Sequence, residues 1–168
     1  VWSDPARAEE ILDRISQGTR IAVADVRAIA SGLATPEVER LGIVGAIPLL
    51  IARFRTDGFN VTLTTNMTEA DELPAEIELA AYLVTAEAIA NSARHAHAST
   101  CLVQVCLNGH LEVSVTDDGV GLPPNPTVGV GLASMRARVE ACTGRFEVGP
   151  GDRGGTRIRA LLPVGVRT

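Results

Sequence analysis

The sequence predicts an α/β (α+β) sandwich, a β-sheet covered by amphipathic helices. Two runs that alternate between apolar and polar residues, 101–107 and 111–117, are separated by Asn108-Gly109, which is typical of a β-hairpin. A long helical pattern over about 74–97 precedes this hairpin. Because a half-buried strand and an amphipathic helix each hide one apolar side, the two patterns together predict a layered domain.

The N-terminal part is predicted to be helical. Asp4-Pro5 is a favourable helix start, and the helix is expected to end near Gly32. Its apolar residues form a narrow seam: Ile11, Ile15, Ala22, Val26 and Ile29. A seam of this kind usually meets a partner helix. A second helix is predicted over about 39–56, with Pro48 as a kink or restart.

Strands and one more helix account for the rest of the chain. The run at 59–65 alternates like a strand, and Leu132, Met135, Arg136 and Val139 fit a helix over about 131–142. Two closing strands are predicted at 145–148 and 155–163.

The loop of the hairpin decides which side chains share a face. A two-residue turn would pair Val105 with Glu112, whereas a three-residue loop keeps the apolar positions of both strands in phase, and we favour the longer loop. One face of the second strand carries the row Leu111, Val113, Val115 and Asp117. A carboxylate that continues an apolar row needs a hydrogen-bond donor as partner.

The long helix carries a polar stripe. Glu87, Asn91 and His95 are spaced four residues apart and lie on one flank of the helix. The apolar side is predicted to consist of Leu79, Tyr82, Leu83, Ala86, Ile89, Ala90 and Ala93. A solvated face would explain Glu87 alone, but asparagine is a poor helix former. The stripe therefore predicts a functional surface, although His95 could also cap the helix or pack near its end.

Composition excludes several classes of protein. The net charge of −5 and the lack of a basic patch argue against nucleic-acid binding. The chain has no lysine, which excludes a P-loop, a eukaryotic-type protein kinase and Schiff-base chemistry. The three cysteines, Cys101, Cys106 and Cys142, form no C-x-x-C motif and are expected to be small buried residues. The longest apolar run, about 41–52, is too short to cross a bilayer.

The order of four motifs is far more specific than any of them alone. "EAIANSARHA" begins at Glu87, "DDGVGL" at Asp117, "GVGLASMRARV" at Gly129 and "GGTRIRALLP" at Gly154. This order resembles the N box and glycine boxes of the ATP-binding catalytic domain of bacterial two-component sensor histidine kinases. These kinases belong to the GHKL (HATPase) superfamily. The resemblance covers roughly 36–165, and it implies a Bergerat-type mixed, mostly antiparallel sheet with helices on one face.

The resemblance also implies a sub-type and a domain organisation. "DVRAIASGLATPEVERLGIVGAI" is similar to the segment that follows the phosphoacceptor helix in nitrate-sensor/DesK-like kinases. Residues 1–33 are then the C-terminal helix of a partial dimerisation domain, and 36–168 form the ATP-binding catalytic domain. The acceptor histidine is expected to lie upstream of Val1, because the first 94 residues contain no histidine.

The resemblance assigns roles to individual residues. Asp117 would accept a hydrogen bond from the adenine amino group, supported by Thr156 through its hydroxyl or a water. Asn91 would bind Mg²⁺, and Glu87 would act as the base-like catalytic residue. Arg94 and His95 would face the phosphates. The backbone of the two glycine boxes is expected to bind the nucleotide, at Gly119, Gly121, Gly129, Val130, Gly131 and Leu132.

The resemblance implies ATP-dependent phosphorylation of a protein histidine, followed by transfer of the phosphoryl group to a response regulator. That regulator is expected to carry a helix-turn-helix output domain. The parent protein is expected to be a homodimer, with this domain in the cytoplasm and a membrane anchor elsewhere as an option. Two alternatives stay open: an anti-sigma or serine-kinase-type switch of the same superfamily, and a non-enzymatic nucleotide-gated interaction module. Residues 122–130, with three prolines, are expected to form a lid over ATP.

Overall fold

The computed structural model describes residues 36–56, 58–95, 98–121, 129–152 and 154–165, without the side chain of His95. These residues all belong to one compact unit, Thr35–Thr168. The predicted helix at 1–32 lies outside the described residues, as does most of the predicted lid. None of the described helices has the length and apolar character that a bilayer crossing requires.

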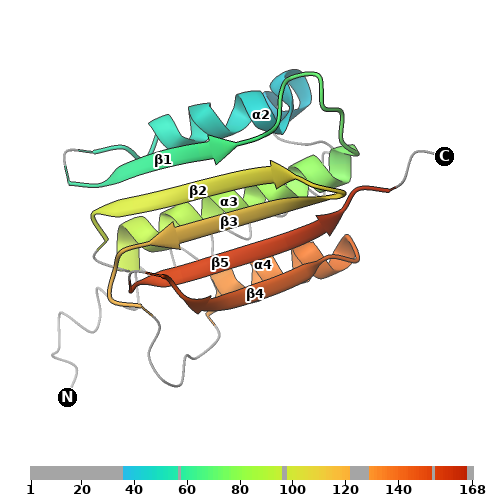
Figure 1. Ribbon diagram of the computed structural model, residues 1–168. Helices are drawn as coiled ribbons and strands as arrows, with labels where there is room; N and C mark the ends of the chain where they lie inside the picture. The colour runs from blue at the N-terminus through green and yellow to red at the C-terminus, as the bar shows by residue number, and fades with distance from the viewer. Residues whose placement is uncertain (1–35, 57, 96–97, 122–128, 153, 166–168) are drawn as a thin grey trace, which may run out of the picture. The chain divides into compact units, whose positions relative to one another are not determined.

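A five-stranded sheet forms one layer of the domain (Figure 1). Its strands are β1 (Asn60–Thr65), β2 (Thr100–Leu107), β3 (His110–Asp117), β4 (Arg145–Pro150) and β5 (Thr156–Pro163). They lie in the order β1-β2-β3-β5-β4, so β5 inserts between β3 and β4. The pair β1–β2 is parallel and the other three pairs are antiparallel. The predicted mixed, mostly antiparallel sheet is confirmed.

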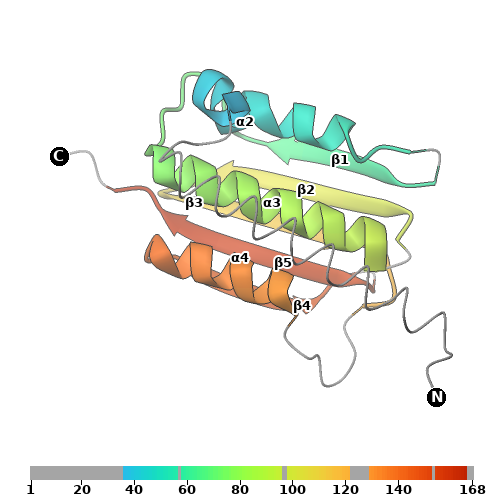
Figure 2. The same cartoon turned by 180° about the vertical axis from the view of Figure 1, so that it is seen from behind.

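Three helices form the second layer, and all of them cover the same face of the sheet (Figure 2). They are α2 (Pro36–Ala52), α3 (Ala75–His95) and α4 (Val130–Ala141). The long helix α3 lies between the other two and crosses the middle of the sheet. The α/β sandwich with helices on one face is therefore confirmed.

The hairpin between β2 and β3 has the predicted three-residue loop. Leu107 pairs with Leu111, and Val105 pairs with Val113 rather than with Glu112. Gly109 adopts a φ of 75°, a left-handed conformation that glycine allows without steric cost. This register places the apolar residues of both strands on the face that the helices cover, because one residue of slip would turn every side chain to the other face.

The prediction for α3 was partly wrong about which side is buried. Ala93 is exposed and Leu79, Leu83 and Ala86 are only half-buried. Tyr82, Ile89 and Ala90 are buried as predicted, and the buried set also includes a row of small residues that periodicity did not select: Ala81, Thr85, Ala88 and Ser92. Small side chains let the helix axis approach the strands closely, and large ones on that side would hold it away. Hydrophobic periodicity gives little weight to alanine and hydroxyl side chains, so it did not predict that this row is buried.

The kink of α2 lies at Gly42 and not at Pro48, where it was predicted. Gly42 has a φ of 62° and a ψ of 179°, whereas Pro48 lies inside regular helix. After the kink, the backbone N–H of Ile43 donates to Glu78 Oε1 of α3 at 2.9 Å. This carboxylate satisfies an N–H that the kink has freed from the helix, so a contact with α3 stabilises the break.

Candidate nucleotide site

Asp117 ends β3 and continues its buried row into a polar site. The apolar members of the row, Leu111, Val113 and Val115, are at most 2% exposed, and Asp117 is 7% exposed. Its Oδ1 accepts hydrogen bonds from the backbone N–H groups of Gly119 and Thr156, both at 3.0 Å. The sequence predicted that Asp117 needs a hydrogen-bond donor, and two backbone N–H groups from separate segments of the chain fill that role.

The second oxygen of Asp117 is bound from the helical layer. The Ser92 hydroxyl of α3 lies 3.0 Å from Asp117 Oδ2. Because Ser92 follows Asn91, this contact joins the carboxylate at the end of β3 to the polar stripe of α3. Sequence reasoning had not selected Ser92; its only signal was a hydroxyl among the alanines of the helix.

Two glycines let the loops on either side of Asp117 pack backbone against backbone. Gly155 has a φ of 69°, and a Cβ there would overlap the backbone oxygen of Asp117. Gly121 has a φ of 75°, and its Cβ would lie 3.1 Å from the Gly155 oxygen. Gly121 was predicted as a site residue and Gly155 was not, although "GGT" contains it. Both positions need a residue without a side chain.

The polar stripe of α3 meets the first turn of α4. Glu87 Oε1 is buried and has no hydrogen-bond partner among the described residues. A Cβ on Gly131 would overlap this oxygen and would lie 3.5 Å from Asn91 Nδ2. Glu87, Asn91 and Gly131, which the sequence analysis selected from two separate motifs, are therefore close together. A buried carboxylate oxygen without a donor is costly, which indicates that it serves a ligand.

Burial raises the pKa of the Glu87 carboxyl above its ordinary value, and the nearby Arg94 guanidinium opposes this shift. The net direction is upward because loss of solvation outweighs the attraction of an exposed arginine. A buried carboxyl group with a raised pKa is typical of a proton-accepting residue at an active site.

The N-terminus of α4 offers backbone donors beside this carboxylate. Gly129 is the N-cap residue with extended backbone, and its carbonyl accepts the N–H of Ala133 at 3.1 Å. The N–H groups of Val130, Gly131 and Leu132 precede this first intrahelical bond. Free N–H groups and the helix dipole at such an end favour anions, and phosphate is one of them.

Three further residues of the sequence motifs lie at or beside the ends of α3, β5 and β3. His95 is the last residue of α3 and its side chain is outside the description. Thr156 touches Asp117 through its backbone N–H. Asp118, expected to be a turn residue, accepts the N–H groups of Ser99 and Thr100, both at 2.8 Å. It therefore ties the start of β2 to the end of β3.

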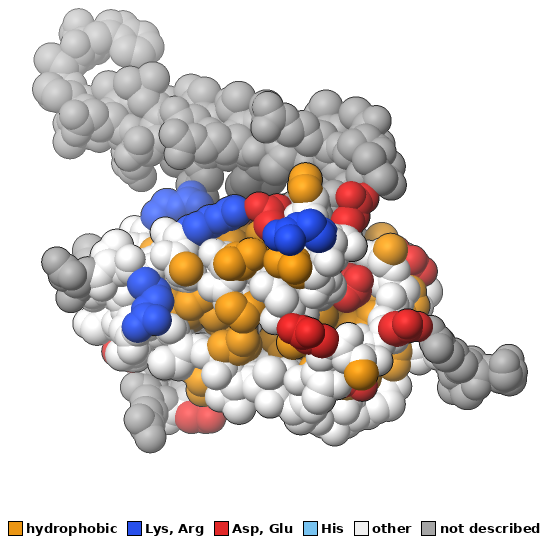
Figure 3. Space-filling model, turned by 90° about the horizontal axis from the view of Figure 1, so that it is seen from above, with side chains coloured by type: hydrophobic (Ala, Val, Ile, Leu, Met, Phe, Trp, Pro, Cys, Tyr) orange, Lys and Arg blue, Asp and Glu red, His pale blue; other side chains and the backbone are white. Residues whose placement is uncertain are grey.

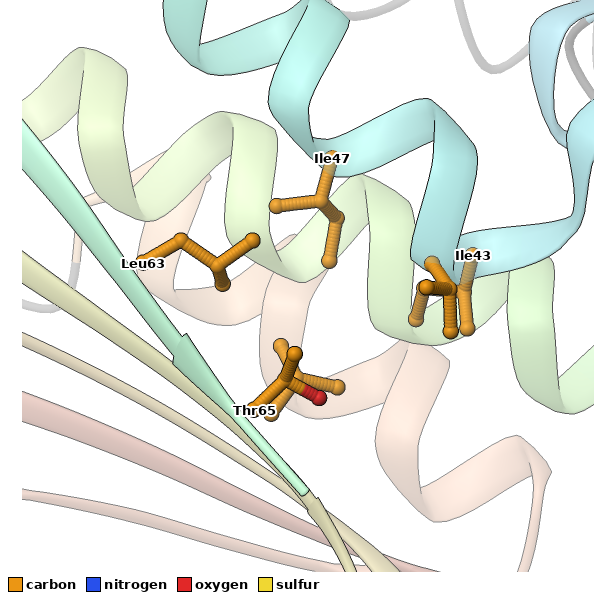
Figure 4. Close-up of a pocket in the computed structure, with 6 residues that line it drawn as sticks. Ile43, Ile47, Leu63 and Thr65 are labelled. Carbon is orange, nitrogen blue, oxygen red and sulfur yellow. The ribbon is translucent and has the colours of Figure 1, made fainter. Parts of the chain in front are cut away.

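An apolar recess lies toward the opposite end of the sheet from Asp117, and none of the side chains that line it is titratable. It lies between α2, β1 and β2, on the edge of the molecule seen in Figure 3, and Figure 4 shows its side chains. Those side chains belong to Ile43, Val44, Ile47, Leu63, Thr65 and Val105. Since Thr65 pairs with Val105 while Cys101 pairs with Asp117, this recess is remote from the polar site.

Comparison with known proteins identifies the family. A profile described as "Histidine kinase-, DNA gyrase B-, and HSP90-like ATPase" matches residues 76–166, more than half of the chain. The chain belongs to this ATPase family. Both halves of the polar site, from Glu87 of α3 to Thr156 of β5, lie inside the matched region. The resemblance seen in the sequence motifs is confirmed, and ATP is the nucleotide that the family uses.

Curated relatives of this ATPase domain are sensor histidine kinases. The chain is 25% identical over 158 residues to sensor histidine kinase YxjM of Bacillus subtilis (strain 168), and the match covers 94% of the chain and 38% of that protein. It is 27% identical to sensor histidine kinase MctS of Rhizobium johnstonii, covering 90% of the chain and 34% of that protein. The chain thus spans little more than a third of the length of these relatives.

A solved structure supports the fold of the ATPase domain. The histidine kinase domain of the Erythrobacter litoralis EL346 blue-light activated histidine kinase superposes with a TM-score of 0.59 at 17% identity. The alignment covers 95% of both chains. At this level of identity the likeness concerns the fold, and the roles of individual side chains have to be argued from the site itself.

Proposed function

We propose that this chain contains the catalytic domain of a two-component sensor histidine kinase, which transfers the γ-phosphoryl group of ATP to a histidine of its parent protein. The observation that carries the proposal is the joint site on α3. One end binds the buried Asp117 carboxylate through Ser92, and the other holds Glu87 Oε1, buried without a partner, against the α4 N-terminus. The names of the curated relatives support the same activity.

At the adenine end, the chemistry of Asp117 fits an amino donor. Two backbone N–H groups occupy Oδ1, and Ser92 reaches Oδ2. A carboxylate oxygen can accept a further hydrogen bond, so Oδ2 is the atom we assign to the adenine amino group. Gly119 and Gly121 line the loop that follows β3 and let the nucleobase approach its backbone.

At the phosphate end, the described residues fit a nucleotide triphosphate with Mg²⁺. Within the described residues no cluster of three or more acidic, histidine or cysteine side chains could hold a metal alone. Asn91 would instead supply one amide oxygen, and a Mg²⁺ ion with few protein ligands is usual when phosphates complete its coordination. The ion would neutralise charge on the phosphates. Arg94, exposed beside Glu87, and His95 would contact phosphate oxygens.

Phosphoryl transfer then depends mainly on positioning. The N–H groups of Val130, Gly131 and Leu132 would bind phosphate oxygens, and Gly129 and Gly131 leave room for them. Glu87 would accept a hydrogen bond from the attacking imidazole and orient it toward the γ-phosphorus. The leaving ADP stays bound until the loop at 122–130, proposed as a lid, opens.

The rest of the parent protein enters the proposal through the sequence. Residues 1–33 would be part of a dimerisation domain, which makes the parent a homodimer, and 36–168 would be the catalytic domain. The phosphoryl group would pass to a response regulator in the cytoplasm. An anti-sigma or serine-kinase-type switch is the alternative enzyme, and it would phosphorylate a serine instead of a histidine.

Nucleotide binding is tested by exchanging one atom of Asp117. In Asp117→Asn, the two backbone donors hold the amide oxygen at the Oδ1 position, so the amide nitrogen faces the adenine amino group and two donors meet. The affinity for ATP should fall about 10- to 100-fold, the range for losing a hydrogen bond to a charged group. Asp118→Asn is the matched control, because among the described residues the Asp118 carboxylate accepts from Ser99 and Thr100 and has no hydrogen bond to the Asp117 site. Equal affinities of Asp117→Asn and wild type for a fluorescent ATP analogue would contradict the assignment.

Phosphoryl transfer is tested with γ-labelled ATP. The 168-residue chain alone should form no acid-labile phosphohistidine, yet should label a separately supplied acceptor helix pair from its parent protein. Glu87→Gln should abolish this transfer while ATP binding persists. Acid-stable label on serine would favour the switch alternative, and binding without transfer under any condition would favour the nucleotide-gated module.

A further inference from the structure

The contact between Ser92 and Asp117 lies beneath the proposed adenine site. Ser92 is 4% exposed, and its hydroxyl has two acceptors within reach, Asp117 Oδ2 at 3.0 Å and the Ala88 carbonyl at 3.1 Å. A hydroxyl has a single proton and donates to one acceptor at a time. Neither acceptor has a proton to give, so the two oxygens compete for the hydroxyl proton. The charged carboxylate is the stronger acceptor and also the nearer one, so the proton is directed at Asp117.

A third buried group, the thiol of Cys101, belongs to the strand next to Asp117. Cys101 of β2 pairs with Asp117 across the ladder and is 1% exposed. Burial raises the pKa of its thiol to about 12, so the thiol stays neutral and adds no charge beside the carboxylate. Little water can therefore replace the serine proton on the inner side of Asp117.

We propose that Ser92 is a positioning residue for nucleobase selection, because its hydroxyl proton fixes Asp117 Oδ2 as an acceptor toward the ligand. The inference rests on the proposed function and deepens it. With the inner side of Oδ2 occupied by Ser92 and Oδ1 held by two N–H groups, the carboxylate cannot turn, and its outer lone pair is directed at the site. A base that presents an amino group is then preferred over one that presents a carbonyl.

The test compares ATP with inosine triphosphate, which has a carbonyl where adenine has its amino group. Wild type should prefer ATP, and Ser92→Ala should reduce the ratio of the two affinities by about tenfold, the scale of one hydrogen bond to a charged group. Ser92→Cys, which keeps a weaker donor of similar size, should give an intermediate ratio. Thr85→Val is the matched control, because Thr85 is a buried residue of the same helix side whose hydroxyl bonds to Ala81 and not to Asp117.

A second arm shows whether Ser92 acts through Asp117. In an Asp117→Asn background, Ser92 can accept from the amide and donate to Ala88, so removing its hydroxyl should leave the ratio of affinities unchanged. An unchanged ratio in Ser92→Ala, an equal loss of both affinities, or the same loss in the Asp117→Asn background would each overturn this inference. If wild type binds neither nucleotide, the proposed function fails together with this inference. If wild type prefers ATP and Ser92→Ala prefers it by the same ratio, only the role of Ser92 is wrong.

Discussion

Gly131→Ala is expected to separate the stability of the fold from its function. Gly131 lies in the first turn of α4 with ordinary helical backbone, where alanine is favoured over glycine by about 1 kcal/mol. The added methyl would lie within 3.0 Å of Glu87 Oε1, a distance that real Cβ atoms essentially never show, and 3.3 Å from its Cδ. The carboxylate must therefore move, and overpacking of this kind costs about 1–3 kcal/mol.

The two effects partly cancel in the free energy of unfolding, which should fall by no more than about 2 kcal/mol. They do not cancel in catalysis. A displacement of about 1 Å of a positioning group lowers a rate roughly 100-fold. Phosphoryl transfer by Gly131→Ala should therefore fall by about two orders of magnitude, with a smaller loss of ATP affinity.

A double-mutant cycle with Glu87→Ala tests the cause. Without the Glu87 carboxylate the methyl has room, so Gly131→Ala should then stabilise the protein by up to about 1 kcal/mol. Urea unfolding of the four proteins gives the coupling energy, expected at about 1–3 kcal/mol. Gly149→Ala is the control, since nothing lies within 4 Å of a Cβ there. An identical effect of Gly131→Ala in both backgrounds would refute the steric argument.

Three further predictions concern stability. Glu87→Gln should raise the melting temperature at pH 7 by about 3 °C, corresponding to about 1 kcal/mol, because it removes a buried charge. The Glu87 pKa is raised in the folded state, so wild type gains stability as the pH falls through that pKa. The higher melting temperature of Glu87→Gln should therefore vanish toward pH 4. A difference in melting temperature that is constant with pH would contradict a buried carboxylate. Gly155→Ala should lower the unfolding free energy by about 2–4 kcal/mol, because a left-handed φ and an overlap with Asp117 coincide; thermal melts equal to those of wild type would contradict it. Asp118→Ala should lower the unfolding free energy by at most about 1 kcal/mol at pH 7, because the carboxylate is exposed. Backbone hydrogen bonds lower the pKa of Asp118, so this loss should disappear as the pH falls through the lowered pKa. Urea unfolding at several pH values would show it.

Local sequence determined those features that depend on neighbouring residues along the chain. Asn108-Gly109 indicated the hairpin, and the alternation of its strands favoured a three-residue loop, because that register keeps both apolar rows on one face. The same alternation placed Asp117 on the buried row before any partner was known. The spacing of Glu87 and Asn91 put both on one flank of α3, and the order of the motifs was sufficient to recognise the family.

The tertiary structure decided what depends on distance between segments. Periodicity correctly predicted the burial of Ile89 and Tyr82 on α3. It missed the buried small residues Ala81, Thr85 and Ala88, whose side chains allow close packing. The kink of α2 moved to Gly42 because Glu78, 35 residues away from Ile43, satisfies the freed N–H. Ser92 reaches Asp117 across 25 residues of sequence. No local pattern carries such contacts, since each arises only where packing brings two segments together and burial requires every polar group to find a partner.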